Sequence, residues 1–217
     1  MNTTNIILIA TNIPIVLVAL YSALIYKKLE KELRLFSWFL FLSFFIQIPS
    51  MILYIFGINN MPLLHIYTLV GGVLIILFYK EVLQSYLSGK ILLWAAGVYA
   101  LFILINSLFL EAILTFNTNG LIVEAAVVVI LALSTFNLLL QQKELFKNKA
   151  MYKSINWINS GFFIYFCSNL LLYYFGDYLV RSSISILDFR HIWLLHSLFT
   201  ITLYICFFFG LWKSPKH

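Results

Sequence analysis

Runs of about 20 apolar residues recur along the whole sequence, separated by short polar stretches. A helix of that length spans the hydrocarbon core of a bilayer. Only 10% of the residues are charged, whereas a soluble domain usually carries about 25%. One water-soluble core could not cover so much apolar surface, so the sequence predicts an integral membrane protein.

Seven apolar runs can be distinguished in the sequence. The predicted spans are 5–26, 35–57, 61–86, 91–111, 119–141, 155–176 and 189–212. All are expected to be helices, because lipid offers no hydrogen-bond partner to backbone groups. No basic stretch precedes the first run and no small-residue cleavage pattern follows it, so it is interpreted as a retained helix rather than a signal peptide. The predicted fold is all-α, a single domain over residues 1–217 that forms a bundle of seven transmembrane helices.

Basic residues predict the direction in which the chain is inserted. Twelve of the fourteen Lys and Arg residues follow the first, third, fifth and seventh runs, and only Arg181 and Arg190 lie on the other side. The positive-inside rule then puts the N-terminus outside and the C-terminus in the cytoplasm, as expected for a multi-pass protein of a bacterial inner membrane. The net charge of +6 does not indicate nucleic acid, because the bases occupy separate short loops instead of one face.

Polar side chains inside the runs recur at helical spacing. Gln47 follows Ser43 by four residues and Thr200 follows His196 by four, so each pair shares one face of its helix. In the predicted orientation most such residues lie in the outer half of the membrane, and polar groups in a membrane usually face the bundle interior. The sequence therefore predicts a polar pocket open to the outside. The residues assigned to it are Glu124, His65, His196, Gln47, Asn169, Trp193 and Thr200.

Glu124, four residues after Gly120, has two compatible interpretations. In the first, the carboxylate lies in the first turns of its helix, where the helix dipole favours an anion and Asn119 caps the helix. In the second, it lines an outward-facing cavity with His65 and His196. For each histidine the simpler interpretation is an interhelical hydrogen bond. Zinc is compatible with these three ligand types, but no sequence spacing supports a metal site and none is predicted.

The sequence lacks the residues of several membrane chemistries. A covalent retinal pigment needs a lysine in the middle of the last run, but Lys213 lies at its end. An HExxH helix, a GxSxG elbow and a P-loop are absent, so no catalytic motif is found. The fifth and sixth runs lack the prolines that three-plus-one-plus-three sugar transporters place in both repeats. Cys167 and Cys206 fall inside apolar runs and predict neither a metal site nor a disulfide framework.

Three stretches resemble a known group of proteins: FNTNGLIVEAAVVVILAL, NSGFFIYFCSNLLLYYF and HIWLLHSLFTITLYICFFFGLWK. They resemble small bacterial seven-helix membrane proteins, and are similar to the membrane segments that precede some sensor histidine kinases. The resemblance implies that Glu124, Trp193 and His196 occupy recurrent positions. No kinase domain follows before His217, so a separate membrane or cytoplasmic partner is expected to read any signal.

These features favour a receptor-like or sensory module that binds a small molecule or lipid from the outer side. A transporter or channel is the first alternative; it needs a continuous polar path, and the inner halves of the runs carry few polar groups. A second alternative is a membrane enzyme that modifies a lipid, with Glu124 and a histidine as acid and base. A structural or assembly protein would need none of these residues. The sequence leaves the ligand, any cofactor, the partner and the oligomeric state open.

Overall fold

The computed structural model describes the backbone of residues 3–141, 149–181 and 186–214, and the side chains of residues 9–141, 149–172 and 194–214. Within these ranges the chain forms helices and no strand, which confirms the all-α prediction. The α-helices are α1 (Thr3–Ile25), α2 (Lys31–Ile55), α3 (Met61–Val82), α4 (Gly89–Ile105), α5 (Thr118–Gln141), α6 (Lys149–Arg181) and α7 (Ile186–Trp212). A 3-10 turn, η1 (Tyr26–Lys28), follows α1, and a π-helical turn, η2 (Asn106–Leu110), follows α4.

Two helices begin four or more residues earlier than the apolar runs alone predicted. α2 starts at Lys31 instead of residue 35, and α6 starts at Lys149 instead of residue 155. Lys, Glu, Leu and Arg are strong helix formers, so the helical backbone of α2 continues through the charged sequence KELR before it enters the apolar run.

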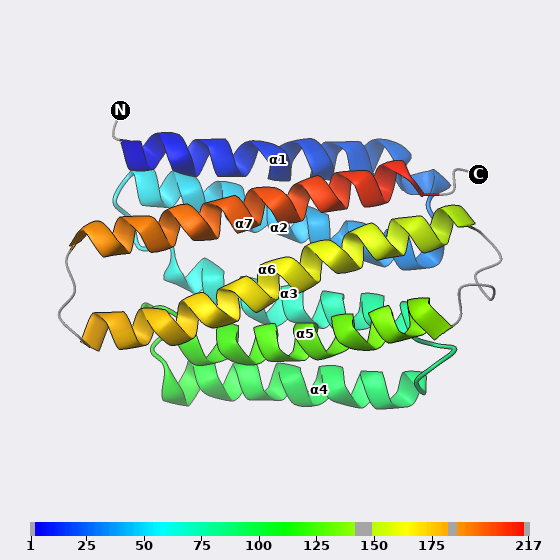
Figure 1. Cartoon of the computed structure of the whole chain (residues 1–217). Coiled ribbons are helices and arrows are strands. Elements are labelled where there is room, and N and C mark those ends of the chain that lie inside the picture. Colours follow the sequence, from blue (N-terminus) through cyan, green and yellow to red (C-terminus); the bar gives the residue numbers. More distant parts are fainter. Residues whose placement is uncertain (1–2, 142–148, 182–185, 215–217) are drawn as a thin grey trace.

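Consecutive helices run antiparallel, so the chain traverses the bundle seven times and its termini lie at opposite ends (Figure 1). By length and composition, six helical segments of the described residues can cross a membrane: Ile9–Lys28, Lys31–Ile55, Met61–Val82, Gly89–Leu110, Thr118–Gln141 and Leu194–Trp212. α6 is long, but it is not among them, and it carries polar residues such as Asn156, Asn159 and Asn169. The structure therefore supports a multi-pass protein of a lipid bilayer with six candidate spans among seven helices.

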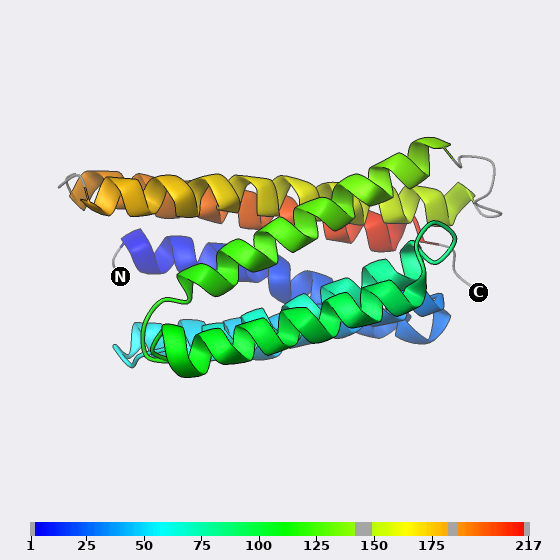
Figure 2. The ribbon, with the colours of Figure 1, turned by 90° about the horizontal axis from the view of Figure 1, so that it is seen from below.

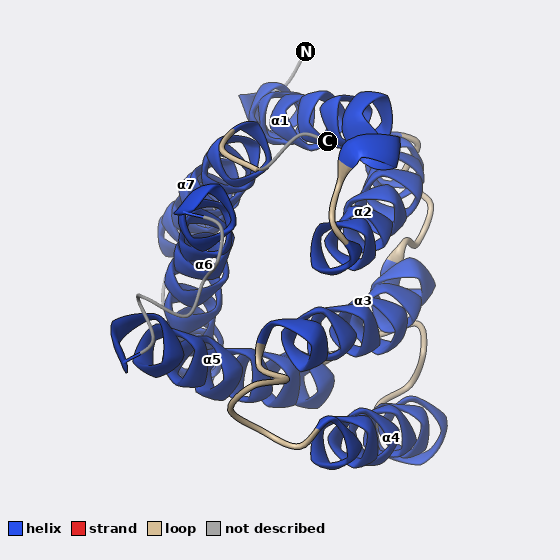
Figure 3. Cartoon of the chain, turned by 90° about the vertical axis from the view of Figure 1, so that its right-hand side faces the viewer, coloured by secondary structure: helices blue, strands red, loops and turns tan. Residues whose placement is uncertain are grey.

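Six of the helices form a closed ring, and α4 lies outside it (Figure 3). Around the ring, α1 packs on α2, α2 on α3, α3 on α5, α5 on α6, α6 on α7, and α7 packs back on α1. α4 packs mainly on α3. Seen from below, α6 and α7 run as neighbours, and α5 crosses them at an angle (Figure 2). The ring thus brings helices from both ends of the sequence around one common interior.

Aromatic rings fill the part of this interior that lies toward the C-terminal end of the bundle. The phenylalanine cluster consists of Phe36 and Phe39 on α2, Phe78 on α3, Phe162 on α6 and Phe207 on α7, and each is at most 2% exposed. The centroid of the Phe207 ring lies 4.8 Å from that of Phe36 and 4.9 Å from that of Phe162. Edge-to-face contacts at such distances stabilise a core beyond the area they bury. The cluster therefore joins four helices and closes this part of the interior.

The closest approach of α6 to α7 depends on glycine. A Cβ atom added at Gly161 would lie 2.8 Å from the Cβ of Cys206 and 3.3 Å from the carbonyl oxygen of Leu203. Both of those atoms are fixed to the α7 backbone, so a side chain at position 161 could be accommodated only if the two helices moved apart. Small residues at membrane helix interfaces commonly permit such close packing.

Gly161→Leu is therefore expected to lower the melting temperature of the purified protein in detergent, because overpacking of this kind costs about 1–3 kcal/mol. The matched control is Gly97→Leu on α4, since a Cβ at Gly97 meets no atom within 4 Å. Leu171→Ala, which trims a side chain that is 59% exposed, should also have a small effect. Equal melting temperatures for the two glycine variants would contradict the close packing of α6 on α7.

Candidate functional site

Glu124 lies in the second turn of α5 and is buried, with 3% of its surface exposed. No described residue donates a hydrogen bond to its carboxylate. The helix start is capped by other residues than the sequence suggested: the backbone N–H of Gly120 donates to Oδ1 of Asn117 at 3.2 Å. The predicted cap Asn119 instead donates its own backbone N–H to Oε1 of Glu111 at 3.0 Å. The prediction of an Asn119 cap was therefore wrong, because α5 begins one residue before it, at Thr118.

Three tyrosines on other helices lie in the same part of the bundle as Glu124. Tyr67 of α3, Tyr99 of α4 and Tyr165 of α6 each lie within electrostatic range of it. A fourth, Tyr204 of α7, interacts with Tyr67. We call these four residues the tyrosine cluster. One buried carboxylate and four phenol groups from five helices thus meet in one region of the bundle.

The tyrosine cluster is held by hydrogen bonds to its surroundings. The hydroxyls of Tyr67 and Ser43 are 3.1 Å apart, and the Tyr99 hydroxyl donates to the backbone carbonyl oxygen of Thr68 at 2.7 Å. Tyr99 lies directly over Gly72, where an added Cβ would collide with its ring. Gly72 therefore makes the room that lets a residue of the outlying helix α4 reach the region of Glu124.

The tyrosine cluster is less completely buried than the phenylalanine cluster. Tyr99 and Tyr204 are buried, with 4% and 2% of their surfaces exposed. Tyr67 and Tyr165 are only partly buried.

Three more of the predicted site residues are brought together beside Tyr165. Nδ1 of His196 lies 2.8 Å from Oδ1 of Asn169, and the His196 ring packs on that of Tyr165 with centroids 5.8 Å apart. Thr200 donates its hydroxyl to the backbone carbonyl oxygen of His196 at 2.9 Å and also interacts with Tyr165. Asn169 is 1% exposed, and although Tyr165 lies beside it, its Nδ2 makes no hydrogen bond of acceptable geometry. Glu124, Asn169, His196 and Thr200 are thus grouped around one tyrosine.

His65 lies in a different set of contacts. Its Nδ1 is 2.8 Å from the hydroxyl of Ser107, and its Nε2 is 3.1 Å from the carbonyl oxygen of Thr115. A carbonyl only accepts, so Nε2 carries the hydrogen and, in a neutral ring, Nδ1 accepts from Ser107. His65 therefore ties α3 to η2 and the following loop, which matches the interhelical hydrogen bond considered for it.

The remaining predicted site residues are not joined to Glu124 by any contact of the described side chains. Gln47 is partly buried on α2, and no hydrogen bond links it to the site. Trp193 lies in α7, but its side chain falls outside the described residues. No three His, Cys, Asp or Glu side chains in the described part of the chain could hold a metal ion, so Glu124, His65 and His196 do not form such a group.

A hollow opens at the end of the bundle that holds the N-terminus. It has a volume of about 500 Å³ and is lined by Tyr54, residues 57–61 and residues 114–116. Thr115, whose carbonyl binds His65, belongs to this lining. Glu124 does not line it, so the structure does not show the predicted pocket as one continuous opening. A second, apolar hollow of about 410 Å³ lies between α2 and α3, among residues such as Trp38 and Leu74.

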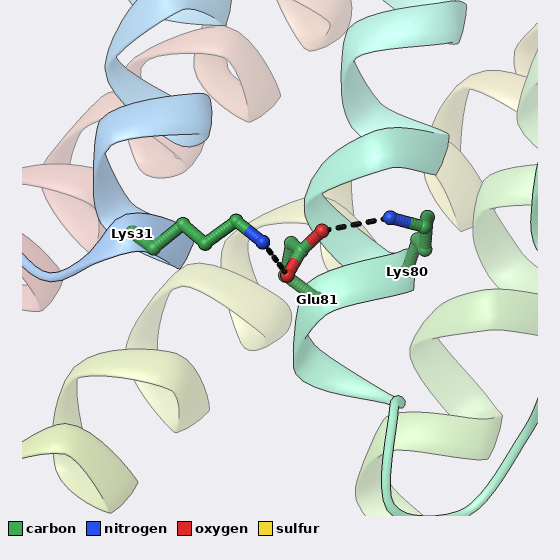
Figure 4. Close-up of polar contacts among 3 residues, drawn as sticks. All are labelled: Lys31, Lys80 and Glu81. Atoms are coloured by element: carbon green, nitrogen blue, oxygen red, sulfur yellow. Dashed lines mark hydrogen bonds and ion pairs between the residues drawn. The ribbon is translucent and has the colours of Figure 1, made fainter. Parts of the chain in front are cut away.

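Glu81, the other buried carboxylate of the described chain, and Glu111, which is partly buried, differ from Glu124 because they have partners. Both oxygens of Glu81, at the end of α3, are used: Nζ of Lys31 lies 2.8 Å from one and Nζ of Lys80 lies 2.9 Å from the other (Figure 4). Glu111 accepts from the Asn106 side chain at 2.8 Å as well as from the Asn119 backbone. Sequence analysis treated Lys31 and Lys80 only as markers of topology, and it missed this ion-paired group.

A further interhelical connection lies between the candidate site and the C-terminal end of the bundle. The Tyr79 hydroxyl donates to Oδ1 of Asn159 at 2.8 Å, and Nδ2 of Asn159 donates to the carbonyl oxygen of Ala132 at 3.1 Å. Tyr79 and Asn159 are fully buried. Because Asn159 is satisfied on both sides, it serves to join α3, α5 and α6 and does not offer a free group to a ligand.

Comparison of the chain with protein-family models, curated proteins and solved structures found no match. Its function is therefore inferred from its own residues.

Proposed function

We propose that this chain is a seven-span protein of a bacterial inner membrane, with its N-terminus outside, and that it acts as a receptor-like module. In this proposal a small ligand enters from the outer side and binds among Glu124 and the tyrosine cluster. Binding changes the packing of the helices, and a membrane or cytoplasmic partner reads the change.

The observation that carries this proposal is the unpaired carboxylate of Glu124. A charge left alone in a membrane protein is costly, and ionisable residues in such places usually mark a functional site. The chain provides partners for Glu81 and Glu111 but none for Glu124 among the described residues. A ligand that donates hydrogen bonds or carries positive charge would supply the missing partner.

The seventh crossing, by α6, is supported by its place in the bundle. α6 runs antiparallel between α5 and α7, and both of those contain candidate spans (Figure 1). Its polar residues Asn159 and Asn169 are buried against other helices. Polar groups that face a bundle interior are compatible with a transmembrane helix, and seven crossings agree with the alternation of basic loops.

The phenylalanine cluster favours a binding protein over an open channel. Its rings pack in the interior on the C-terminal side of the tyrosine cluster, and among the described residues this part of the interior is mostly apolar. A transporter would have to open this cluster during its cycle. Access to Glu124 from one side or from both therefore separates the two functions.

The test is chemical labelling of Glu124→Cys in a chain whose Cys167 and Cys206 are replaced by alanine. A cationic, membrane-impermeant methanethiosulfonate should modify position 124 in right-side-out vesicles and not in inside-out vesicles. Ile130→Cys is the matched control, because residue 130 is on the same helix but is 63% exposed on the bundle surface, so it should react from neither side.

Labelling of position 124 from both sides would support a transporter or channel. Absence of labelling from either side, in a variant that keeps its melting temperature, would contradict a site that ligands reach from outside.

A further inference from the structure

The apolar hollow between α2 and α3 opens on the surface of the bundle. Trp38 and Phe45, which line it from α2, are 54% and 70% exposed, and Val70, which lines it from α3, is 38% exposed. In a bilayer such a surface faces lipid. The full lining is Trp38, Phe41, Leu42, Phe45, Val70 and Leu74, so the hollow offers no charged group of its own.

The 3-10 turn η1 is held against one end of this hollow by an aromatic contact. The ring of Tyr26 lies 6.3 Å from that of Trp38 and 6.0 Å from that of Phe41, measured between centroids. The next two residues in η1 are Lys27 and Lys28, and both are exposed. The contact therefore keeps two positive charges beside the end of the hollow that Trp38 lines.

A third base lies at the same end on α2 itself. Arg34 precedes Trp38 by four residues, so the two share one face of the helix. Nε of Arg34 donates to the carbonyl oxygen of Leu29 at 2.7 Å, which anchors the guanidinium group. Its terminal nitrogens are further donors, and arginine binds phosphate groups through such paired donors. We call the three exposed bases the basic triad: Lys27, Lys28 and Arg34.

The positive charge of this segment is only partly neutralised within the chain. Residues 27–34 include four basic and two acidic residues. Lys31 is paired with Glu81, which also binds Lys80 (Figure 4). The basic triad makes no ion pair with a described residue. An apolar surface hollow thus ends at a group of bases that can bind an anion.

We propose that the hollow and the basic triad bind one anionic phospholipid. The headgroup phosphate contacts the bases, and an acyl chain lies in the hollow beside α2. Tyrosine and tryptophan gather at the headgroup level of membranes, so Tyr26 and Trp38 mark the boundary between the two parts. Basic groups beside membrane helices are a common means of recognising anionic headgroups.

The size of the hollow fits this occupant. Its volume of about 410 Å³ falls within the range of about 300–1,000 Å³ that is usual for ligand sites. From Trp38 to Phe45 it extends about 10 Å along α2, in the direction that leads from the bases into the apolar run. The inference does not depend on the receptor-like function. With the N-terminus outside, the lipid belongs to the cytoplasmic leaflet.

Quenching of Trp38 fluorescence by brominated lipid tests the proposal in the full chain. Nanodiscs of one fixed mixture of phosphatidylglycerol and phosphatidylcholine carry bromine on the acyl chains of either the first or the second lipid, so the surface charge is constant. The difference between the unmodified chain and Trp38→Phe gives the signal of Trp38. After correction for the share of each lipid, brominated phosphatidylglycerol should be favoured at least about fivefold, the effect of one base near an anionic group.

Trp94 is the matched reporter. It is 77% exposed near the start of α4 and lines neither hollow. Its signal, obtained from Trp94→Phe in the same way, should show a smaller preference than that of Trp38.

Two triple variants assign the preference to the basic triad. Lys27→Gln, Lys28→Gln and Arg34→Gln together should lower the preference at Trp38 to that at Trp94. The control makes three glutamine substitutions at exposed lysines of the same end of the bundle and should retain the preference at Trp38 (Figure 1). The lysines replaced in the control are Lys90, Lys149 and Lys153.

The proposal is overturned if the two brominated lipids quench Trp38 equally, or if the two triple variants lose the preference to the same extent. Quenching of Trp38 by neither lipid would also overturn it, because a second copy of the chain or another protein would then cover the hollow. Native mass spectrometry of the unmodified chain gives a result that needs no variant. The chain should retain phosphatidylglycerol over phosphatidylcholine from an equimolar mixture, and equal retention would contradict the proposal.

Discussion

A cysteine placed at Ile58 will react with a membrane-impermeant maleimide added to intact cells, whereas cysteines at Ser88 and Lys213 will react only after permeabilisation. Ile58 lies between α2 and α3, Ser88 between α3 and α4, and Lys213 just after α7. All three residues are exposed in the structure. The positive-inside rule puts the first outside and the other two in the cytoplasm, so the expected difference is all or none.

Labelling at position 213 reports whether α6 crosses the membrane. Five helices lie between Ile58 and Lys213, so the two positions face opposite sides only if α6 crosses the membrane with the other four. A background in which Cys167 and Cys206 are alanine gives the blank signal. Labelling of Lys213→Cys in intact cells, together with Ile58→Cys, would mean that α6 does not cross. Labelling of Ser88→Cys and Lys213→Cys in intact cells, without labelling of Ile58→Cys, would reverse the orientation and make the site face the cytoplasm.

Asn159→Leu is expected to destabilise the bundle by about 1–3 kcal/mol, the cost of leaving a buried polar partner unsatisfied. The substitution removes the acceptor of the Tyr79 hydroxyl and the donor to the Ala132 carbonyl. Both groups are buried between helices and have no water to replace the lost bond. Denaturation in mixed detergent micelles, followed by circular dichroism, measures the change.

Asn156→Leu is the matched control, because Asn156 is on the same helix and is only partly buried. It should leave stability unchanged or raise it. A second comparison is the double variant Tyr79→Phe with Asn159→Leu, which removes the hydroxyl together with its acceptor and should recover part of the loss. If Asn159→Leu is as stable as the unmodified chain, the connection between α3, α5 and α6 does not contribute to stability.

The helices could be predicted from the sequence because their cause is local. An apolar run long enough to cross a bilayer must form a helix, because only a helix satisfies its backbone groups in lipid. The predicted runs at α3 and α5 both start within one residue of the observed helices. The sequence also predicted a span over residues 155–176, but Asn156, Asn159 and Asn169 lower the hydropathy of α6, and its described part is not among the candidate spans. Its buried polar side chains have partners on other helices, and no single-helix measure includes those partners.

The candidate site could be predicted only in part, because it depends on how each helix is rotated. The spacing of His196 and Thr200 placed them on one face, and the structure keeps them together beside Asn169. Tyr67 and Tyr99 were missed, because tyrosines are common in membrane helices and nothing local distinguishes those that face Glu124. His65 was assigned to the pocket by depth alone, and its hydrogen bonds to Ser107 and Thr115 were not visible in the sequence.

The ring of described helices is closed by two helices that are far apart in the sequence. α1 is synthesised first and α7 last, yet they are neighbours that complete the ring. Before α7 packs in place, the sides of α1 and α6 that contact it are uncovered. Oδ1 of Asn169 then lacks the hydrogen bond that it makes with His196. Tyr204 is also still absent from the tyrosine cluster. The tyrosine cluster and the ring of described helices are therefore completed only when α7 packs against α1 and α6.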